Sequence, residues 1–426
     1  MRLSSRSWHH ATNDGFCRQG HIQVSRRIRK LPLVGAETVL DVLSLTLYSS
    51  EAFLGATPLV NNSPQKPPYG LRTERISGSS FTAPRDQNLQ TWIYRASSSL
   101  DHDGFVPFTA EAPSQAPSFL SPNSYMWPTF PVKKSSDWLS QSLLARTGDP
   151  ATKTGLAIWI FSISESMPKQ TAFSSLDGDS LIIPQSGALD ITTELGKLLV
   201  RQNEICIIPR GTRYQVSLPA GPCRGFVCEL FQGHFRLPEL GPVGSTGLAN
   251  VRDFQIPTAF FDGQLKDNVA VANNADFTII SRQAGKLWST QQDHTPFDVA
   301  AWHGTNYPYK YDLARYCVLG NALFDEHDPS LYTVLTVPNG REQGTSVVDF
   351  AIIPPRWMVA EDTFWLPYFH RNTMSEFYGP IVNNQSKEYP FNGGLDFKPF
   401  GAGLNGPMVT HGKSARSWGR HYADDA

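Results

Sequence analysis

Two histidines and one glutamate near the end of the chain have the residue types of a metal-ligand set. His370 and Glu376 are six residues apart, and His411 follows in the segment Met408-Val-Thr-His-Gly412. Side chains alternate along a strand, so an even spacing directs His370 and Glu376 to one face, whereas a helix would splay them apart. Such a facial triad leaves the opposite face of Fe(II) open for O2 and a chelating substrate. Zinc accepts the same residue types, so the spacing alone neither selects the metal nor excludes an ordinary surface pair.

The composition predicts that short β-strands position these residues. The chain has 33 glycines, 32 prolines and 12% aromatic residues, a mixture that favours strands joined by tight turns over long helices. Short helices are expected only at 135–145 and 312–320. Apolar runs bounded by turn signals predict strands at 155–163, 180–184, 204–211, 214–218, 332–336 and 347–354.

Two apolar strands that each end at a proline turn, Ile207-Ile-Pro-Arg210 and Ile352-Ile-Pro-Pro-Arg356, indicate that one structural unit occurs twice. The turn Pro209-Arg-Gly211 resembles the second motif of cupin barrels, but Tyr214 stands where a metal cupin has histidine. We therefore predict a mostly β, two-domain cupin-like (bicupin) jelly roll with short helices, whose first barrel carries no metal.

The expected domains are a β domain at 59–313 and a metal-binding domain at 314–426, preceded by an extension at 1–58. The first thirty residues are rich in arginine and serine, as in organelle transit peptides. A disordered or non-native extension is the preferred interpretation, because no cleavage pattern follows. The second domain is expected to be shortened at its C-terminal end.

Charge and cysteine content argue against several classes of function. The net charge is −1, which gives no reason to expect nucleic acid or an anionic membrane surface as a partner. No apolar run approaches the length of a membrane span. The five cysteines are too scattered for a disulfide framework, so reduced thiols in a cytoplasmic protein are expected.

Many segments resemble the homogentisate 1,2-dioxygenase family in order and spacing. The resemblance covers roughly residues 60–412 and extends far beyond any short motif. It is carried by the segments 68–71, 76–85, 92–95, 177–185, 203–206, 237–244, 247–254, 296–304, 308–311, 328–330, 354–357 and 370–377.

The resemblance implies an Fe(II) enzyme that opens the ring of homogentisate with O2 to give maleylacetoacetate, in the breakdown of tyrosine and phenylalanine. The family's His-Arg-Asn-x-Met-Ser-Glu motif supplies two iron ligands, which fall on His370 and Glu376. The later Met-x-x-His-Gly motif supplies the third, His411, which also borders the substrate. The implied partners are a small aromatic substrate, O2 and further copies of the chain in a trimer or hexamer.

Four positions around these ligands bear on proton transfer and substrate binding. The family's catalytic histidine aligns with Glu326 in Phe324-Asp-Glu-His-Asp-Pro-Ser330, and His327 follows one residue later. Either residue could act as the base, since a one-residue shift reverses a side chain on a strand but not in a loop. Gln385 replaces a substrate-binding tyrosine and Asn405 a pocket histidine, and both amides retain hydrogen-bonding capacity.

These departures leave two alternatives open. The first is a paralogue that acts on another hydroquinone or a gentisate-like diphenol, because specificity depends on the pocket contacts that changed. The second is a family member that folds without turnover, because Glu326 occupies the catalytic position.

Overall fold

The computed structural model describes residues 48–60, 62–109, 121–239, 248–316, 332–354, 369–381 and 400–412. All of them belong to one compact unit, Val39–Ala426.

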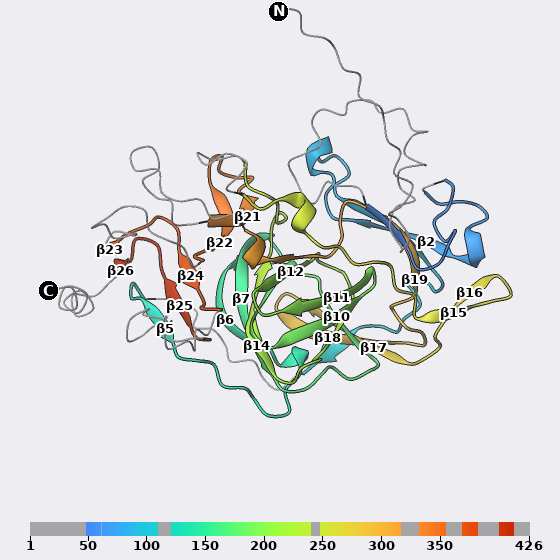
Figure 1. Ribbon diagram of the computed structural model, residues 1–426, viewed down its shortest axis with the longest axis horizontal. Coiled ribbons are helices and arrows are strands. Elements are labelled where there is room, and N and C mark those ends of the chain that lie inside the picture. The colour runs from blue at the N-terminus through green and yellow to red at the C-terminus, as the bar shows by residue number, and fades with distance from the viewer. Residues whose placement is uncertain are drawn as a thin grey trace, which may run out of the picture. The chain divides into compact units, whose positions relative to one another are not determined.

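Two large sheets form the centre of the fold (Figure 1). The strands of the first are β4 (Val106–Phe108), β8 (Thr171–Ser175), β10 (Ala188–Thr193), β11 (Gly196–Arg201), β13 (Tyr214–Ser217), β17 (Phe277–Gln283) and β18 (Lys286–Gln292). Those of the second are β6 (Ser142–Asp149), β7 (Thr154–Ile163), β9 (Asp179–Ser186), β12 (Glu204–Ile208), β14 (Cys223–Leu230) and β20 (Tyr309–Asp312). Their orders are β11-β10-β13-β8-β17-β18-β4 and β20-β12-β9-β14-β7-β6. Only the β8–β17 pairing within them is parallel.

Strand β7 shows how the sequence builds the core. Trp159 and Phe161 enter the cluster that fills the space between the two sheets, whereas Ile158 and Ile160 enter a second cluster on the outer face of the six-stranded sheet. Because side chains alternate, a strand covered on both faces reads as one continuous apolar run. Each such buried side chain contributes about 1.5–3 kcal/mol. The strand predicted at 155–163 is therefore confirmed.

A four-stranded sheet lies beside the large sheets, with the order β1-β19-β3-β2. Its strands are β1 (Tyr48–Glu51), β2 (Arg72–Ser77), β3 (Gln90–Arg95) and β19 (Val299–Gly304), and the hairpin β15 (Gly263–Lys266)–β16 (Val269–Ala272) belongs to the same region. β1 lies inside the stretch 1–58 that was expected to be an extension. Its antiparallel pairing with β19 places these residues in the folded unit, because the backbone groups of β1 complete the ladder of β19.

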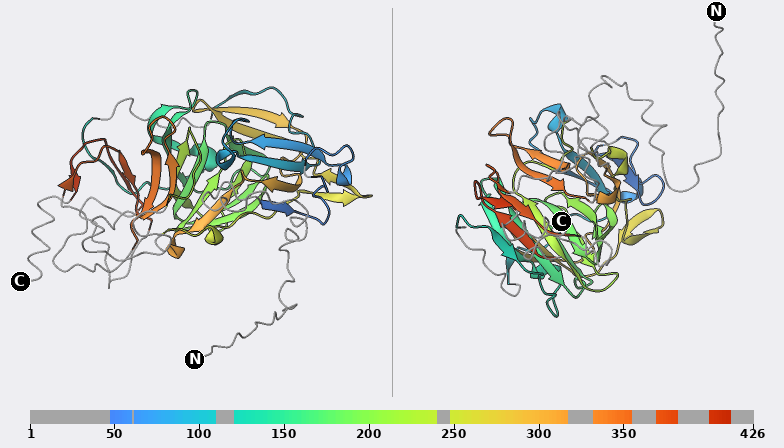
Figure 2. Two further views of the ribbon diagram at one scale, coloured as in Figure 1. Left: turned by 90° about the horizontal axis from the view of Figure 1, so that it is seen from above. Right: turned by 60° about the vertical axis from the view of Figure 1, so that its left-hand side comes forward.

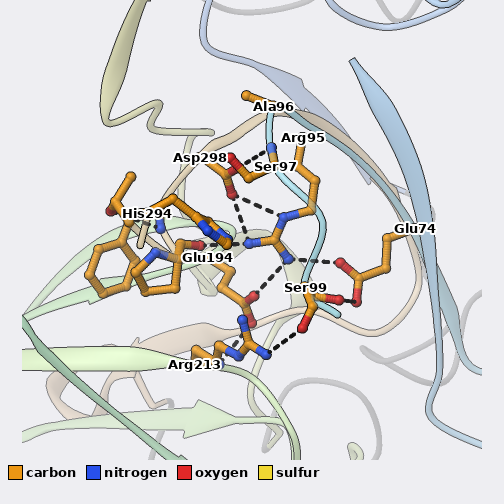
Figure 3. A network of polar contacts seen from close by, with 12 residues as sticks. Glu74, Arg95, Ala96, Ser97, Ser99, Glu194, Arg213, His294 and Asp298 are labelled. Atoms are coloured by element: carbon orange, nitrogen blue, oxygen red, sulfur yellow. Dashed lines mark hydrogen bonds and ion pairs between the residues drawn. The ribbon is translucent and has the colours of Figure 1, made fainter. Parts of the chain in front are cut away.

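A buried arginine connects this sheet to the seven-stranded sheet (Figure 3). Arg95 ends β3, is 1% exposed and contacts three carboxylates. Its guanidinium lies 2.7 Å from Asp298 Oδ1, 2.7 Å from Glu74 Oε2 and 3.1 Å from Glu194 Oε1. Burial would lower the pKa of Arg95, but the three carboxylates outweigh burial and raise it. The cation therefore stays charged inside the protein.

The C-terminal strands form three small sheets (Figures 1 and 2). They are β21 (Tyr332–Pro338) with β22 (Ser346–Ile352), β23 (Phe369–His370) with β26 (His411–Gly412), and β24 (Glu376–Tyr378) with β25 (Ala402–Asn405) and β5 (Tyr125–Trp127). Gln185 of β9 donates to the carbonyls of Pro380 and Gly401, both at 3.0 Å. Phe226 of β14 packs edge-on against Phe377, with ring centroids 5.1 Å apart. The six-stranded sheet thus contacts the chain around β24 and β25, and β24 carries Glu376.

Helices in the described part of the chain are single 3-10 turns. They are η2 (Pro68–Gly70), η3 (Arg85–Gln87), η4 (Trp138–Ser140), η6 (Val251–Asp253) and η7 (Leu313–Arg315). The mostly β prediction is confirmed, and η4 and η7 fall in the two predicted helical stretches. The helix expected at 135–145 is wrong beyond η4, because strand β6 begins at Ser142. None of the described helices is long and apolar enough to cross a bilayer.

Candidate metal centre

Strand pairing brings the two candidate histidine ligands together. His370 of β23 lies directly opposite His411 of β26 in the antiparallel register. Their ring centroids are 4.3 Å apart, with the rings at 66° to each other. The two imidazoles therefore lie beside each other although 41 residues separate them in the sequence.

Glu376 reaches both histidines. Its Oε2 lies 2.7 Å from His411 Nε2, and its Oε1 lies 3.8 Å from His370 Nε2. Among the described residues these three form the one group of histidine, cysteine and carboxylate side chains with donor atoms close enough for a metal ion, all within 4.8 Å of one another. A turn at 371–375 separates His370 from Glu376. The reasoning from one continuous strand is therefore wrong: the turn, not the alternation of a strand, makes them converge.

Hydrogen bonding prepares His411 to bind a cation. Its Nδ1 lies 2.8 Å from the carbonyl oxygen of Val409, which can only accept, so Nδ1 carries the proton. Nε2 lies 2.7 Å from Glu376 Oε2, and a contact of this length needs either a proton or a metal ion between the two atoms. A backbone carbonyl that fixes the tautomer is also the usual outer-shell partner of a metal-bound histidine.

Among the described residues, His370 has no competing partner. Its Nδ1 is buried and lacks a hydrogen-bond partner among the described residues, and the nearest carboxylate oxygen to Nε2 is the one at 3.8 Å. Metal–ligand bonds of about 2.1 Å at right angles give donor separations of about 3 Å. The separations of 2.7 and 3.8 Å lie on either side of this value. The donor set and its spacing fit one divalent ion.

Sequence reasoning did not identify Asn372, which contacts the carboxylate of the group. Its side-chain nitrogen Nδ2 donates to Glu376 Oε1. Its backbone carbonyl accepts from Met408 N at 2.6 Å, in the turn before β26. The only sequence signal was its position between His370 and Glu376 in the motif.

Asn405, predicted to bind substrate, lies beside Glu376 on the neighbouring strand. It is the register partner of Glu376, is 3% exposed, and its Oδ1 has no hydrogen-bond partner among the described residues. Burial raises the pKa of the neighbouring phenol of Tyr378, and a hydrogen bond from Asn405 opposes this shift. The ring of Tyr378 lies against the backbone of Gly403, at a distance that would not admit a Cβ. Asn405 is thus adjacent to the candidate ligands.

Three predicted site residues, Glu326, His327 and Gln385, lie outside the described residues. Their placement stays a prediction.

The first barrel holds an ion pair in its interior. Arg282 lies 3.2 Å from Glu229 and 3.9 Å from the centroid of the Trp159 ring. Tyr214 accepts a hydrogen bond from Trp138 Nε1 at 3.1 Å. No group of metal-binding side chains is found in this barrel among the described residues. The buried cation neutralises the carboxylate there.

Other candidate groups have structural partners. His303 Nε2 lies 3.0 Å from the hydroxyl of Tyr94, and Lys310 pairs with Glu204 at 2.9 Å. The described cysteines, 206, 223 and 228, are free and buried. Burial raises the pKa of Cys223 and Cys228 to about 12, so both stay protonated thiols.

Comparisons with known proteins agree over most of the chain. Family models described as the N-terminal and C-terminal parts of homogentisate 1,2-dioxygenase match residues 46–313 and 314–425, which fits a two-unit architecture. The homogentisate 1,2-dioxygenase of Emericella nidulans is 50% identical over 370 residues, covering 86% of this chain and 80% of that one. That of Drosophila melanogaster is 44% identical over 375 residues, covering 86% and 82%.

Among solved structures, a cupin-2 domain protein from Shewanella frigidimarina aligns with a TM-score of 0.19 at 17% identity, covering 22% of this chain and 83% of that one. The C-terminal family model extends across the candidate ligands. The chain therefore belongs to the homogentisate 1,2-dioxygenase family.

Proposed function

We propose that the chain binds one Fe(II) ion through His370, Glu376 and His411 and opens the ring of homogentisate with O2 to give maleylacetoacetate. One ring carbon–carbon bond breaks, and both oxygen atoms of O2 enter the product. The observation that carries the proposal is the convergence of these three donors inside the region matched by the family's C-terminal model.

The three side chains have different proposed roles, which follow from their charge and position. Fe(II), when bound, supplies the redox chemistry and brings O2 and the diphenol together. Glu376 contributes the negative charge that retains a divalent cation. His411, whose side chain is 10% exposed, is also assigned to contact with the substrate, as in the family it resembles. Three protein donors on one face leave room for two ligands on the other.

Proton transfer is assigned to the segment 324–330. We propose that Glu326 or His327 takes the phenolic proton of the substrate, because each can serve as a general base near neutral pH when suitably placed. Replacing each separately, with Glu326→Gln and His327→Asn, distinguishes them. The variant that loses the acidic limb of the pH–rate profile identifies the base, because a base must be deprotonated to act.

Two amides are assigned to substrate recognition. Asn405 Oδ1, buried and without a partner among the described residues, suits a substrate hydroxyl donor. Gln385 is assigned to the same pocket. These amides favour a second candidate: the same ring opening on a different hydroquinone or a gentisate-like diphenol.

The proposed setting is a cytoplasmic homo-oligomer, a trimer or hexamer, with neither nucleic acid nor a membrane as partner. Sedimentation of the purified chain measures the assembly state.

One anaerobic experiment tests the function. The protein is loaded with Fe(II), mixed with homogentisate and exposed to O2, while product absorbance and O2 uptake are followed. Uptake of one O2 per homogentisate consumed supports the main proposal. Uptake only with another diphenol supports the second candidate. Stoichiometric iron without uptake on any diphenol, or no bound iron, overturns both.

A further inference from the structure

We propose that Asn372 is the positioning residue of the metal centre: it holds Glu376 Oε1 so that only Oε2 turns toward the ion. The inference rests on the proposed metal site and adds to it a residue that is not itself a ligand. The open face of a bound ion would then remain available for O2 and substrate.

The side-chain hydrogen bond of Asn372 distinguishes the two oxygens of the Glu376 carboxylate. Asn372 Nδ2 donates to Glu376 Oε1, while Glu376 Oε2 faces His411 Nε2 at 2.7 Å. The two carboxylate oxygens therefore have different partners. A carboxylate with one oxygen held by an amide N–H binds a metal through the other oxygen, whereas a free carboxylate can also chelate with both.

Asn372 is also connected to the two histidine ligands. It lies two residues after His370, and its carbonyl accepts from Met408 N at 2.6 Å. Met408 has a positive φ of 58°, and the carbonyl of the next residue, Val409, accepts from His411 Nδ1 at 2.8 Å. One residue thus joins the turn between His370 and Glu376 to the turn that orients His411.

A purely structural role makes a different prediction. An asparagine that stabilises a turn usually accepts a backbone N–H with its side-chain oxygen. Asn250 does so here: its Oδ1 accepts from Arg252 N at 3.1 Å at the start of η6. Asn372 instead directs its nitrogen to a carboxylate. Replacement by aspartate preserves an accepting role but abolishes a donating one.

The test compares three variants by metal affinity. Asn372→Asp removes the donor and places a second carboxylate beside Glu376, Asn372→Gln keeps an amide donor on a longer side chain, and Asn250→Asp is the matched control. Affinity for Co(II), a spectroscopic substitute for Fe(II), is measured by chelator competition. Thermal unfolding of the metal-free protein is measured in parallel.

We expect Asn372→Asp to weaken Co(II) binding about 10–100-fold, the usual effect of losing an outer-shell partner. Its visible Co(II) spectrum should also change, because the carboxylate coordinates differently. Asn372→Gln should recover part of the affinity, and Asn250→Asp should match the unmodified chain. The metal-free unfolding temperature should be unchanged in Asn372→Gln, which adds no charge.

Other outcomes separate this inference from the proposed function. If the unmodified chain binds no stoichiometric metal, the metal site itself fails. If the unmodified chain binds Co(II) and Asn372→Asp binds it equally well with the same spectrum, only the role of Asn372 fails. Loss of folding in both Asn372 variants would assign a structural role and overturn the positioning role.

Discussion

His370 and His411 are opposite each other in the antiparallel ladder of β23 and β26, with ring centroids 4.3 Å apart. Each of these strands is two residues long. Such a ladder has few hydrogen bonds of its own, so neighbouring contacts must hold it. Glu376 contacts a histidine on each strand. Its carboxylate lies 2.7 Å from His411 Nε2 and 3.8 Å from His370 Nε2.

A metal ion should therefore stabilise the ladder. We expect Fe(II) or Co(II) to slow amide hydrogen exchange at 369–378 and 402–412, because binding shifts the local opening equilibrium toward the closed state. Exchange in β7 should not change. Glu376→Gln, which keeps the shape and removes the charge, should abolish the effect, whereas exposed Glu342→Gln should preserve it. Equal protection with and without metal would contradict the prediction.

Arg95 should be essential for stability because it is the buried cation of the network in Figure 3. Asp298 is fully buried and Glu194 is 5% exposed at its side chain, so Arg95→Met leaves buried charges without their partner. We expect a loss of about 3–5 kcal/mol in the free energy of unfolding, measured with urea.

The matched control for Arg95 is Arg252→Met. Arg252 is 80% exposed and lies 3.8 Å from Asp253, so its loss should cost at most about 0.5 kcal/mol. Similar effects of the two substitutions would show that the buried network is not a source of stability.

The His234–Asp179 pair should make stability depend on pH. His234 Nδ1 lies 2.7 Å from Asp179 Oδ2, and Nε2 lies 2.7 Å from the carbonyl of Gly78. Both partners are acceptors, so both nitrogens donate and the ring is an imidazolium. Burial acts against this charge, but Asp179 outweighs burial and raises the pKa of His234 above 6.5. Burial likewise acts to raise the pKa of Asp179, but His234 and Arg210 outweigh it and lower that pKa.

The pKa of His234 is higher in the folded protein than in the unfolded chain, where it is 6.5. Its contribution to stability is therefore fully present below pH 6.5 and is lost as the pH rises through the pKa of the folded state. The lowered pKa of Asp179 gives a contribution present above about 3.9 and lost in acid. The pair should therefore stabilise most between about pH 4 and 6.5. The unfolding temperature should fall as pH rises from 6 to 9, less so in His234→Gln. Identical slopes in the two proteins would refute the assignment.

Much of the fold was predictable because a strand that is buried on both faces needs a continuous run of apolar residues, which is visible in the sequence. The run at 155–163 predicts β7 from side-chain type alone. The candidate ligands were identified from their types and the family resemblance, whereas their mutual geometry was not predictable. The turn at 371–375 and the backbone contact of Asn372 depend on tertiary packing.

Pairing between strands far apart in the sequence accounts for the other differences between the predicted and the observed fold. β5, at Tyr125–Trp127, completes a sheet with β25, at Ala402–Asn405, across the proposed boundary at 313/314. Nothing in either short segment specifies the other, because strand partners are selected by the surrounding core. β1 was assigned to an extension for the same reason: its four residues acquire a strand conformation by pairing with β19.

Asn405 offers the sharpest test of substrate recognition. Its Oδ1 has no partner among the described residues, whereas its amide nitrogen side interacts with Tyr378. Asn405→Leu removes both the accepting oxygen and the donating nitrogen, and the leucine side chain is of similar size. Tyr378→Phe removes only the phenol hydroxyl. If Oδ1 accepts from the substrate, Asn405→Leu should raise KM for homogentisate about 2–10-fold, the effect of one lost hydrogen bond, with kcat little changed. Tyr378→Phe should leave KM unchanged while lowering the unfolding temperature about as much as Asn405→Leu. An equal rise of KM in both variants would assign Asn405 to support of the sheet instead of the substrate.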